Sequence, residues 1–213
     1  MQKGVSTMSD RFAIVREDLH RRYGQAFDAR TIDDVLDEAI AEQLESSRMQ
    51  AYLPVFVERE ASARLRQLAA DKELTHLRRQ EILYVDERNA GRAQLAAAIT
   101  RHLVGHEGVY RSVGLNPVGG IDPNVIAVLK ERGIAHHRLY QKEIVPRTVH
   151  RSDLVVLMGV DSIPGIPGDR YLRWDIADTA DQPMERVREI ADDIEAHVRA
   201  LLQEMGLHPA VGR

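Results

Sequence analysis

Apolar residues recur three or four positions apart through the first third of the chain, a spacing that places them on one face of a helix. The first such stripe consists of Phe12, Val15, Leu19 and Tyr23. We expect this helix to end at Gly24 and a second one to begin at Thr31, whose hydroxyl would cap the first turn while Asp34 completes a capping box. The apolar stripe of the second helix consists of Ile32, Val35, Leu36, Ala39, Ile40 and Leu44.

A third helix is predicted from Pro54, because a proline in the first helical turn loses no hydrogen bond. Its apolar stripe consists of Val57, Ala61, Leu65 and Leu68. Three short amphipathic helices bury little surface by themselves, so such a module usually packs on a neighbour or on its own copy. We therefore predict that residues 1–78 form a three-helix bundle and that the protein is a homodimer through this bundle.

From Glu81 onward the pattern changes to alternating strands and helices. Strands are expected at 82–85, 109–114, 153–159 and 170–174, and helices at 93–103, 123–132, 144–150 and 184–205. Alternation of this kind predicts an α/β domain over residues 79–213, with a four-stranded, doubly wound parallel sheet. Ligands of such sheets bind at the carboxyl ends of the strands, which is where the loop that starts at Asp86 is expected to lie.

Composition and charge exclude several functions. The formal net charge is −4 and the isoelectric point is near 6.1, which argues against a nucleic-acid partner because such proteins usually carry a basic excess. No apolar run is long enough to cross a bilayer, and the start of the sequence lacks the apolar core of a secretion signal. These features predict a cytoplasmic protein that does not contact membranes.

The 213 residues contain no cysteine. The sequence therefore excludes disulfides, zinc sites with thiolate ligands, iron–sulfur clusters and mechanisms that use a cysteine nucleophile. We predict no cofactor and no bound metal.

The loop DERNAGRA, from Asp86 to Ala93, joins an apolar strand to an alanine-rich helix. The first turn of that helix offers unpaired amides and the positive end of the helix dipole, and Arg92 adds a forked cation suited to a tetrahedral oxyanion. Gly91 would let the backbone approach the anion, and Asn89 can fix the loop through hydrogen bonds. A turn of the same composition also occurs where no ligand binds, so a purely structural loop is the alternative interpretation.

The segment from Glu81 to Leu207 resembles the low-molecular-weight protein tyrosine phosphatase and arsenate reductase family. VDERNAGRAQLAAA (Val85–Ala98) is similar to the signature of that family, and the resemblance continues in RSVGLNPVGGIDPNVIAVLKERGI, SDLVVLMG and PGDRYLRWDIADTADQPMERVREIADDI. The N-terminal third resembles a three-helix module that precedes the reductase domain in some actinobacterial relatives.

The resemblance assigns roles to single positions. It places Asp86 where the family has its cysteine nucleophile, Ala93 where it has a serine or threonine hydroxyl, and Asp178 where it has the general acid, although Thr179 replaces the proline that follows. The resemblance also implies the residues that would hold an oxyanion: Glu87, Arg88, Asn89, Ala90, Gly91, Arg92 and Ala93.

Two interpretations of Asp86 follow. A carboxylate can be a nucleophile, but it generally needs a divalent metal such as magnesium, which Asp86 and Glu87 could bind together; this alternative is a phosphatase. A carboxylate can instead occupy the anion loop itself, accepting hydrogen bonds from its amides and pairing with Arg92. We favour the second interpretation, which predicts a non-catalytic binding or regulatory protein, weak binding of phosphate, sulfate or arsenate, and a protein partner.

Overall fold

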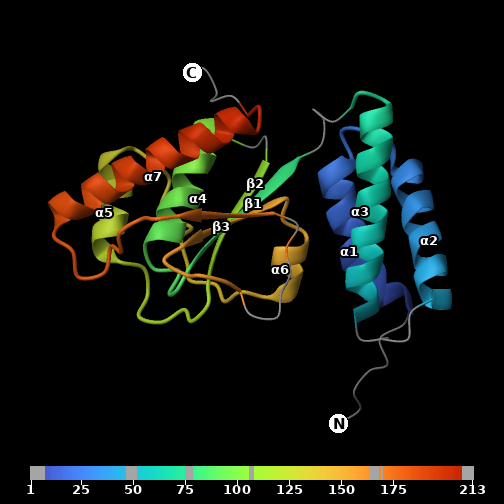
Figure 1. Ribbon diagram of the computed structural model, residues 1–213, viewed down its shortest axis with the longest axis horizontal. Coiled ribbons are helices and arrows are strands. Elements are labelled where there is room, and N and C mark those ends of the chain that lie inside the picture. Colours follow the sequence, from blue (N-terminus) through green and yellow to red (C-terminus); the bar gives the residue numbers. More distant parts are fainter. Residues whose placement is uncertain are drawn as a thin grey trace, which may run out of the picture. The chain divides into compact units, whose positions relative to one another are not determined.

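The computed structural model describes residues 8–46, 52–74, 79–105, 108–163, 168 and 170–207. By their internal contacts, the residues form two compact units, Met1–Arg79 and Gln80–Arg213. Figure 1 shows helices and no strand in the described part of the first unit, and a sheet combined with helices in the second.

Three helices make up the first unit: α1 (Met8–Tyr23), α2 (Ala29–Ser46) and α3 (Leu53–Asp71). The apolar stripes of the sequence face one another and form a single core, which includes Leu19, Tyr23, Leu36, Val57 and Leu65. The hydroxyl of Tyr23 is buried and donates a hydrogen bond of 3.1 Å to the carbonyl oxygen of Ser62 on α3. The predicted three helices are therefore present.

The start of α2 differs from the sequence-based expectation. The helix begins at Ala29, and the backbone N–H of Thr31 donates a hydrogen bond of 2.8 Å to Oδ1 of Asp28. Thr31 lies inside the first turn, so the predicted cap at Thr31 is wrong and Asp28 takes that role. The hydrogen bond from the Thr31 backbone also lowers the pKa of the Asp28 carboxyl below its ordinary value.

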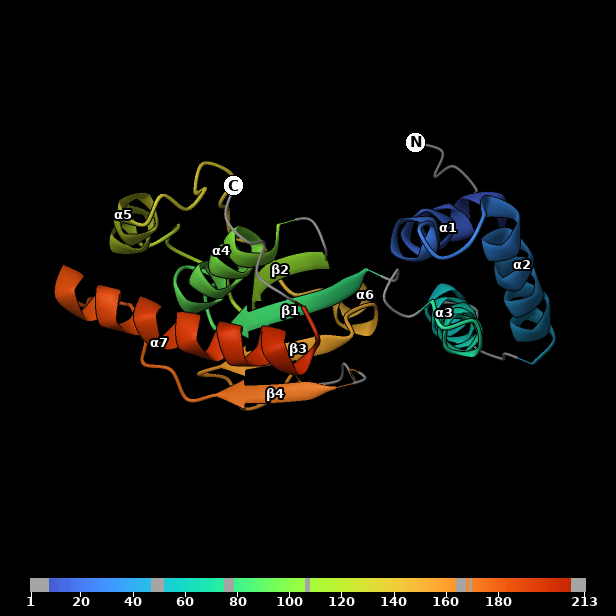
Figure 2. The same ribbon diagram turned by 90° about the horizontal axis from the view of Figure 1, so that it is seen from above.

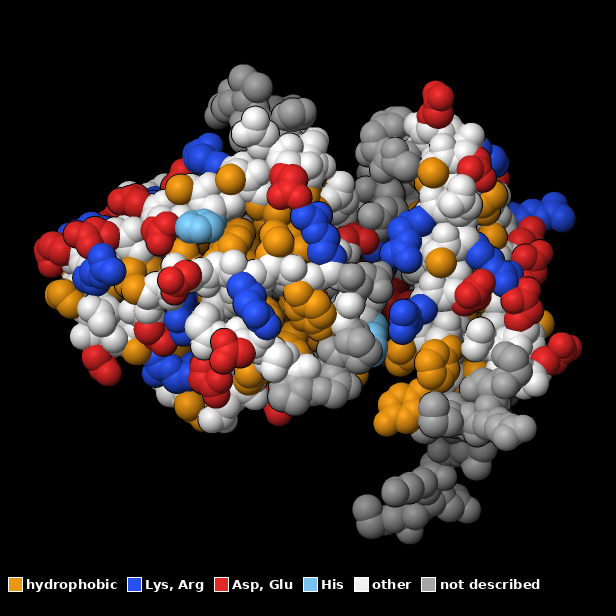
Figure 3. Space-filling view, viewed as in Figure 1, with side chains coloured by type: hydrophobic (Ala, Val, Ile, Leu, Met, Phe, Trp, Pro, Cys, Tyr) orange, Lys and Arg blue, Asp and Glu red, His pale blue; other side chains and the backbone are white. Residues whose placement is uncertain are grey.

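Acidic side chains gather along α2, as Figure 3 shows for this unit. They are Asp33, Asp34, Asp37, Glu38, Glu42 and Glu45. Some of them form ion pairs with neighbouring helices: Arg16 of α1 lies 2.8 Å from Asp37, and Arg64 of α3 pairs with Glu42. Exposed ion pairs of this kind add little stability each, so the bundle depends mainly on its apolar core.

The second unit is built on a parallel sheet with strand order β2-β1-β3-β4. The strands are β1 (Gln80–Asp86), β2 (Gly108–Gly114), β3 (Leu154–Met158) and β4 (Tyr171–Trp174). The predicted four-stranded parallel sheet is confirmed. The pairing places Asp86 opposite Gly114, at the carboxyl ends of the two strands.

Helices cover both faces of this sheet, as Figures 1 and 2 show. They are α4 (Arg92–Val104), α5 (Pro123–Glu131), α6 (Pro146–His150) and α7 (Met184–Glu204). Ile82 and Tyr84 of β1 belong to the core formed with α4, α5 and α7, whereas Leu83 and Val85 belong to the core that includes Val149 of α6. This alternation follows from the period of two in a strand.

Two side chains fix details of this unit. Asp122 caps α5, accepting a hydrogen bond of 2.9 Å from the backbone N–H of Asn124. Trp174 is 8% exposed, with its ring centroid 5.7 Å from that of Tyr84. Among the described residues, no helix is long and apolar enough to cross a membrane.

Candidate functional site

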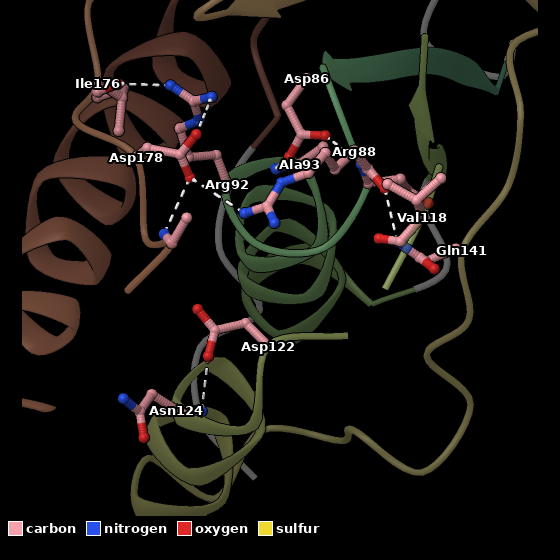
Figure 4. A network of polar contacts seen from close by, with 12 residues as sticks. Asp86, Arg88, Arg92, Ala93, Val118, Asp122, Asn124, Gln141, Ile176 and Asp178 are labelled. Atoms are coloured by element: carbon pink, nitrogen blue, oxygen red, sulfur yellow. Dashed lines mark hydrogen bonds and ion pairs between the residues drawn. The ribbon is translucent and has the colours of Figure 1, made fainter. Parts of the chain in front are cut away.

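The side chain of Asp86 lies inside the loop that follows β1 and is 3% exposed. Its Oδ1 accepts a hydrogen bond from the backbone N–H of Asn89, and its Oδ2 accepts one of 2.9 Å from the N–H of Ala93 (Figure 4). Ala93 is in the first turn of α4, where backbone N–H groups have no acceptor within the helix. The carboxylate therefore occupies two of the donor groups that an external anion would use.

Arg92 points away from this carboxylate (Figure 4). Its Nη1 donates to the carbonyl oxygen of Ile176 at 3.0 Å, and its Nη2 donates to Oδ2 of Asp178 at 2.9 Å. The expectation that Asp86 and Arg92 form a pair is therefore not met. One reason is the shape of the site, because a Cβ atom on Gly159 would lie 2.2 Å from Nη1, so the guanidinium fills the space that this glycine leaves.

The carboxylate of Asp178 is held by several groups at once. Besides Arg92, it has the guanidinium of Arg88 at 3.9 Å, and its Oδ1 accepts a hydrogen bond of 3.0 Å from the backbone N–H of Ala180. The side chain is 47% exposed.

Asn89 connects the loop to the rest of the domain. Its φ is +50°, a left-handed conformation that asparagine tolerates better than most residues. Its Oδ1 accepts hydrogen bonds from Nε2 of Gln94 at 2.9 Å and from the backbone N–H of Lys142 at 3.0 Å. Gln94 Nε2 also lies 2.9 Å from the carbonyl oxygen of Tyr140. The segment around Tyr140 and Lys142 is thereby joined to the loop.

Two other loop carbonyls have partners from distant parts of the chain. The carbonyl oxygen of Arg88 accepts a hydrogen bond of 2.7 Å from Nε2 of Gln141, and that of Ala90 accepts one of 3.0 Å from the backbone N–H of Asp122. These bonds fix the loop from outside. Asp86 adds hydrogen bonds on the inside of the loop.

Gly91 lies directly against Thr179. A Cβ atom on Gly91 would be 1.9 Å from Oγ1 of Thr179 and 3.3 Å from its Cγ2, so only glycine fits. The sequence suggested that Gly91 makes room for an anion, and the structure shows that it makes room for a side chain. Thr179 is buried, and its hydroxyl has no hydrogen-bond partner among the described residues.

The two acidic residues proposed as metal ligands differ in exposure. Asp86 is buried with both carboxylate oxygens bonded to amides, whereas Glu87 is exposed. Within the described part of the chain, no group of three or more His, Asp or Glu side chains is placed to hold a metal ion.

Burial raises the pKa of the Asp86 carboxyl above its ordinary value. The hydrogen bonds from Ala93 and Asn89 and the positive charge of Arg92 act in the opposite direction, and the negative charge of Asp178 adds to the rise. Loss of water around the charged form is the largest of these effects.

The predicted site residues lie together at the carboxyl end of β1. The loop from Glu87 to Ala93 surrounds the Asp86 carboxylate, and Asp178 approaches it from the chain that follows β4. Sequence reasoning missed Gln141, Gly159 and the carbonyl of Ile176, because each is distant along the chain and carries no recognisable motif. Gln94 was part of the motif, but nothing in the sequence showed which groups it would bond.

The family to which this architecture belongs is given by comparison with known proteins. A profile described as low molecular weight phosphotyrosine protein phosphatase matches residues 81–209. The chain belongs to this family. The match begins in β1 and extends beyond α7, so it includes the loop and all four strands of the sheet.

Two proteins named as arsenate reductases are similar to this chain. A protein of Halobacterium salinarum named "Putative arsenate reductase" is 29% identical over 127 residues, which are 57% of this chain and 89% of that protein. The solved thioredoxin-dependent arsenate reductase of Corynebacterium glutamicum is 27% identical with a TM-score of 0.54, covering 94% of this chain and 99% of its own.

The tyrosine phosphatase Wzb from Escherichia coli K30, solved in complex with sulphate, shares the fold. Its TM-score is 0.54 at 15% identity, and the match covers 60% of this chain and 99% of that one. The predicted resemblance to the phosphatase and arsenate reductase family is confirmed.

The contact between Gly91 and Thr179 generates a first prediction. We expect Gly91→Ala to lower the free energy of unfolding by about 1–3 kcal/mol, because an added methyl group overlaps the Thr179 side chain. Thr179→Ala removes the overlapping Oγ1 and Cγ2 atoms, so the double variant should recover part of the loss. Urea denaturation of the four proteins gives the coupling between the two sites. A double variant no more stable than Gly91→Ala would contradict this contact.

A second prediction concerns the titration of Asp86. Because the folded-state pKa is raised, the native state holds this proton more tightly than the unfolded chain, and its contribution to stability is lost as pH rises through that pKa. Wild type should therefore lose stability relative to Asp86→Asn between about pH 4, the ordinary aspartate value, and the raised pKa. NMR titration of the Asp86 carboxyl carbon measures the midpoint, and a midpoint at or below the ordinary value would contradict the prediction.

Proposed function

We propose that this protein is a non-catalytic member of its family, a binding or regulatory protein whose oxyanion loop is filled by its own Asp86 carboxylate. The observation that carries the proposal is the pair of hydrogen bonds from the amides of Asn89 and Ala93 to the two oxygens of Asp86. An internal carboxylate supplies the negative charge that a bound phosphate would otherwise supply.

The absence of a thiol supports this proposal. By resemblance, Asp86 stands at the nucleophile position and Ala93 at the position of the hydroxyl that stabilises a thiolate, and the 213 residues contain no cysteine. Arsenate reduction through a thiol cycle needs cysteine thiols that exchange with a disulfide. The chain has no such thiol.

The state of the two carboxylates also argues against acid catalysis or nucleophilic attack. Both oxygens of Asp86 accept amide hydrogen bonds, so attack would first require the loop to open. Asp178, at the general-acid position, is ion-paired with Arg92 and lies near Arg88. The side chains at the nucleophile and general-acid positions, Asp86 and Asp178, therefore both have partners within the chain.

External oxyanions should bind only weakly. A phosphate in the loop would have to displace the Asp86 carboxylate or lie beside it, and two like charges about 4 Å apart repel by about 4 kcal/mol at an effective dielectric constant near 20. Arg92, the cation that would offset this repulsion, is directed toward Asp178. The proposed partner is therefore another protein. Homodimerisation through the helical unit and a cytoplasmic location are further parts of the proposal.

A third prediction tests catalysis directly. Purified wild type should give no turnover of para-nitrophenyl phosphate, with or without magnesium, and no arsenate reduction with a thioredoxin system. Asp86→Asn should be indistinguishable from wild type in both assays. Magnesium-dependent hydrolysis that disappears in Asp86→Asn would instead establish the alternative, a phosphatase that uses Asp86 as its nucleophile.

A fourth prediction tests occupation of the loop. Asp86→Ala removes a negative charge and frees the amides of Asn89 and Ala93, so calorimetry should show sulfate or phosphate binding at least tenfold tighter than in wild type. Glu87→Ala is the matched control. It removes the same charge from the neighbouring residue, whose side chain is exposed. Equal gains in both variants would mean that net charge alone controls affinity. Micromolar affinity in wild type would rule out the filled loop.

A further inference from the structure

A cavity of about 850 Å³ lies beside edge strand β2, separate from the interior of the Asp86 loop. One wall is the face of α4 that carries Ala98 and Arg101, a second is β2 from Tyr110 to Val113, and a third is the segment from Ile134 to Glu143 after α5. Its volume is in the range of cavities that bind small molecules or cofactors. None of the roles assigned so far uses this space.

The cavity is strongly cationic. Among the described residues, its lining contains the cations Arg101, Arg111, Arg138 and Lys142 and one acid, Glu143. Arg111 has a counter-charge in Glu81, at 3.7 Å. The terminal amine of Lys142 instead donates to the carbonyl oxygen of Tyr140 at 3.1 Å, and Nη1 of Arg101 donates to the carbonyl oxygen of Tyr110 at 2.7 Å. Cations whose acceptors are neutral carbonyls retain an unbalanced positive charge.

The pKa of Lys142 reports the same imbalance. Burial and, after it, the positive charges of Arg101 and Arg111 lower it to about 8. The three cations therefore repel one another across the cavity lining. His102 and His137 also line the cavity. An anion with more than one negative charge would relieve this repulsion.

The rest of the lining is apolar or aromatic. Val113, Ile134 and Leu139 contribute aliphatic surface. Tyr140 is 63% exposed, and the Lys142 amine lies 4.2 Å from the centroid of its ring. An exposed aromatic ring beside a cation cluster is a suitable surface for stacking a planar ring that carries a charged substituent.

We propose that this cavity binds a nucleoside polyphosphate, with the phosphates at Arg101, Arg138 and Lys142 and the base against Tyr140 and the aliphatic wall. Both halves of the lining are needed for this assignment. Inorganic phosphate would use the cations alone, and an uncharged aromatic molecule would use the apolar wall alone.

The cavity wall is also bonded to the Asp86 loop. Gln94 lines the cavity, and its Nε2 bonds Asn89 and the carbonyl of Tyr140, while the backbone N–H of Lys142 bonds Oδ1 of Asn89. A molecule that orders Tyr140 and Lys142 therefore acts on the residue that donates to Asp86. The site does not depend on whether the loop itself binds an anion.

The fifth prediction uses ATP as the probe and full-length protein. Calorimetry should show saturable binding at least tenfold tighter for ATP than for tripolyphosphate or adenosine, weakening as salt is raised. Lys142→Gln and Arg138→Gln should each weaken ATP binding at least tenfold. Lys130→Gln is the matched control, because it removes the same charge from an exposed position on α5.

A spectroscopic readout locates the ligand independently of the variants. The chain has four lysines, Lys3, Lys72, Lys130 and Lys142, so reductive ¹³C-methylation gives a simple spectrum. Saturating ATP should raise the pKa of Lys142 and leave those of the other three unchanged. The proposal is overturned if ATP does not bind saturably, if tripolyphosphate binds as tightly, or if Lys142→Gln binds ATP as wild type does.

Discussion

The organisation of the site depends on a buried carboxylate that accepts hydrogen bonds from backbone amides. Placing Asp86 at the end of β1 with 3% exposure would be unfavourable if its oxygens had no partners. The amides of Asn89 and Ala93 provide them, and the start of α4 adds the favourable end of its dipole. The carboxylate and the loop therefore stabilise each other, since each supplies what the other lacks.

Asp86 uses the amides of the loop, and the cations of the site lie around a second carboxylate, that of Asp178. Arg92 would be the natural partner of an anion inside the loop, yet its guanidinium bonds Asp178 and the carbonyl of Ile176. The two acids of the site therefore have different partners. Asp86 accepts hydrogen bonds from backbone amides, and Asp178 pairs with arginine side chains. This division gives both acids partners within the chain, and it underlies the proposal of a non-catalytic protein.

Much of the architecture follows from local sequence, and the details of the site do not. Apolar runs predicted the four strands, and the change of pattern at Asp86 predicted the loop that joins β1 to α4. The cap of α2 was misassigned because Asp28 and Thr31 offer competing polar groups within one turn. The partner of Arg92 is 86 residues away, and such a contact is determined by packing that no local pattern encodes.

Gly159 follows β3 with a φ of +67°, and the missing Cβ atom is what gives the Arg92 guanidinium its place. Gly159 and Arg92 are distant along the chain, and together they determine that the guanidinium bonds Asp178. A larger residue at this turn would collide with the guanidinium, because a Cβ atom there would lie 2.2 Å from Nη1. The absence of a side chain at one turn residue is thus a condition for an ion pair between two distant segments of the domain.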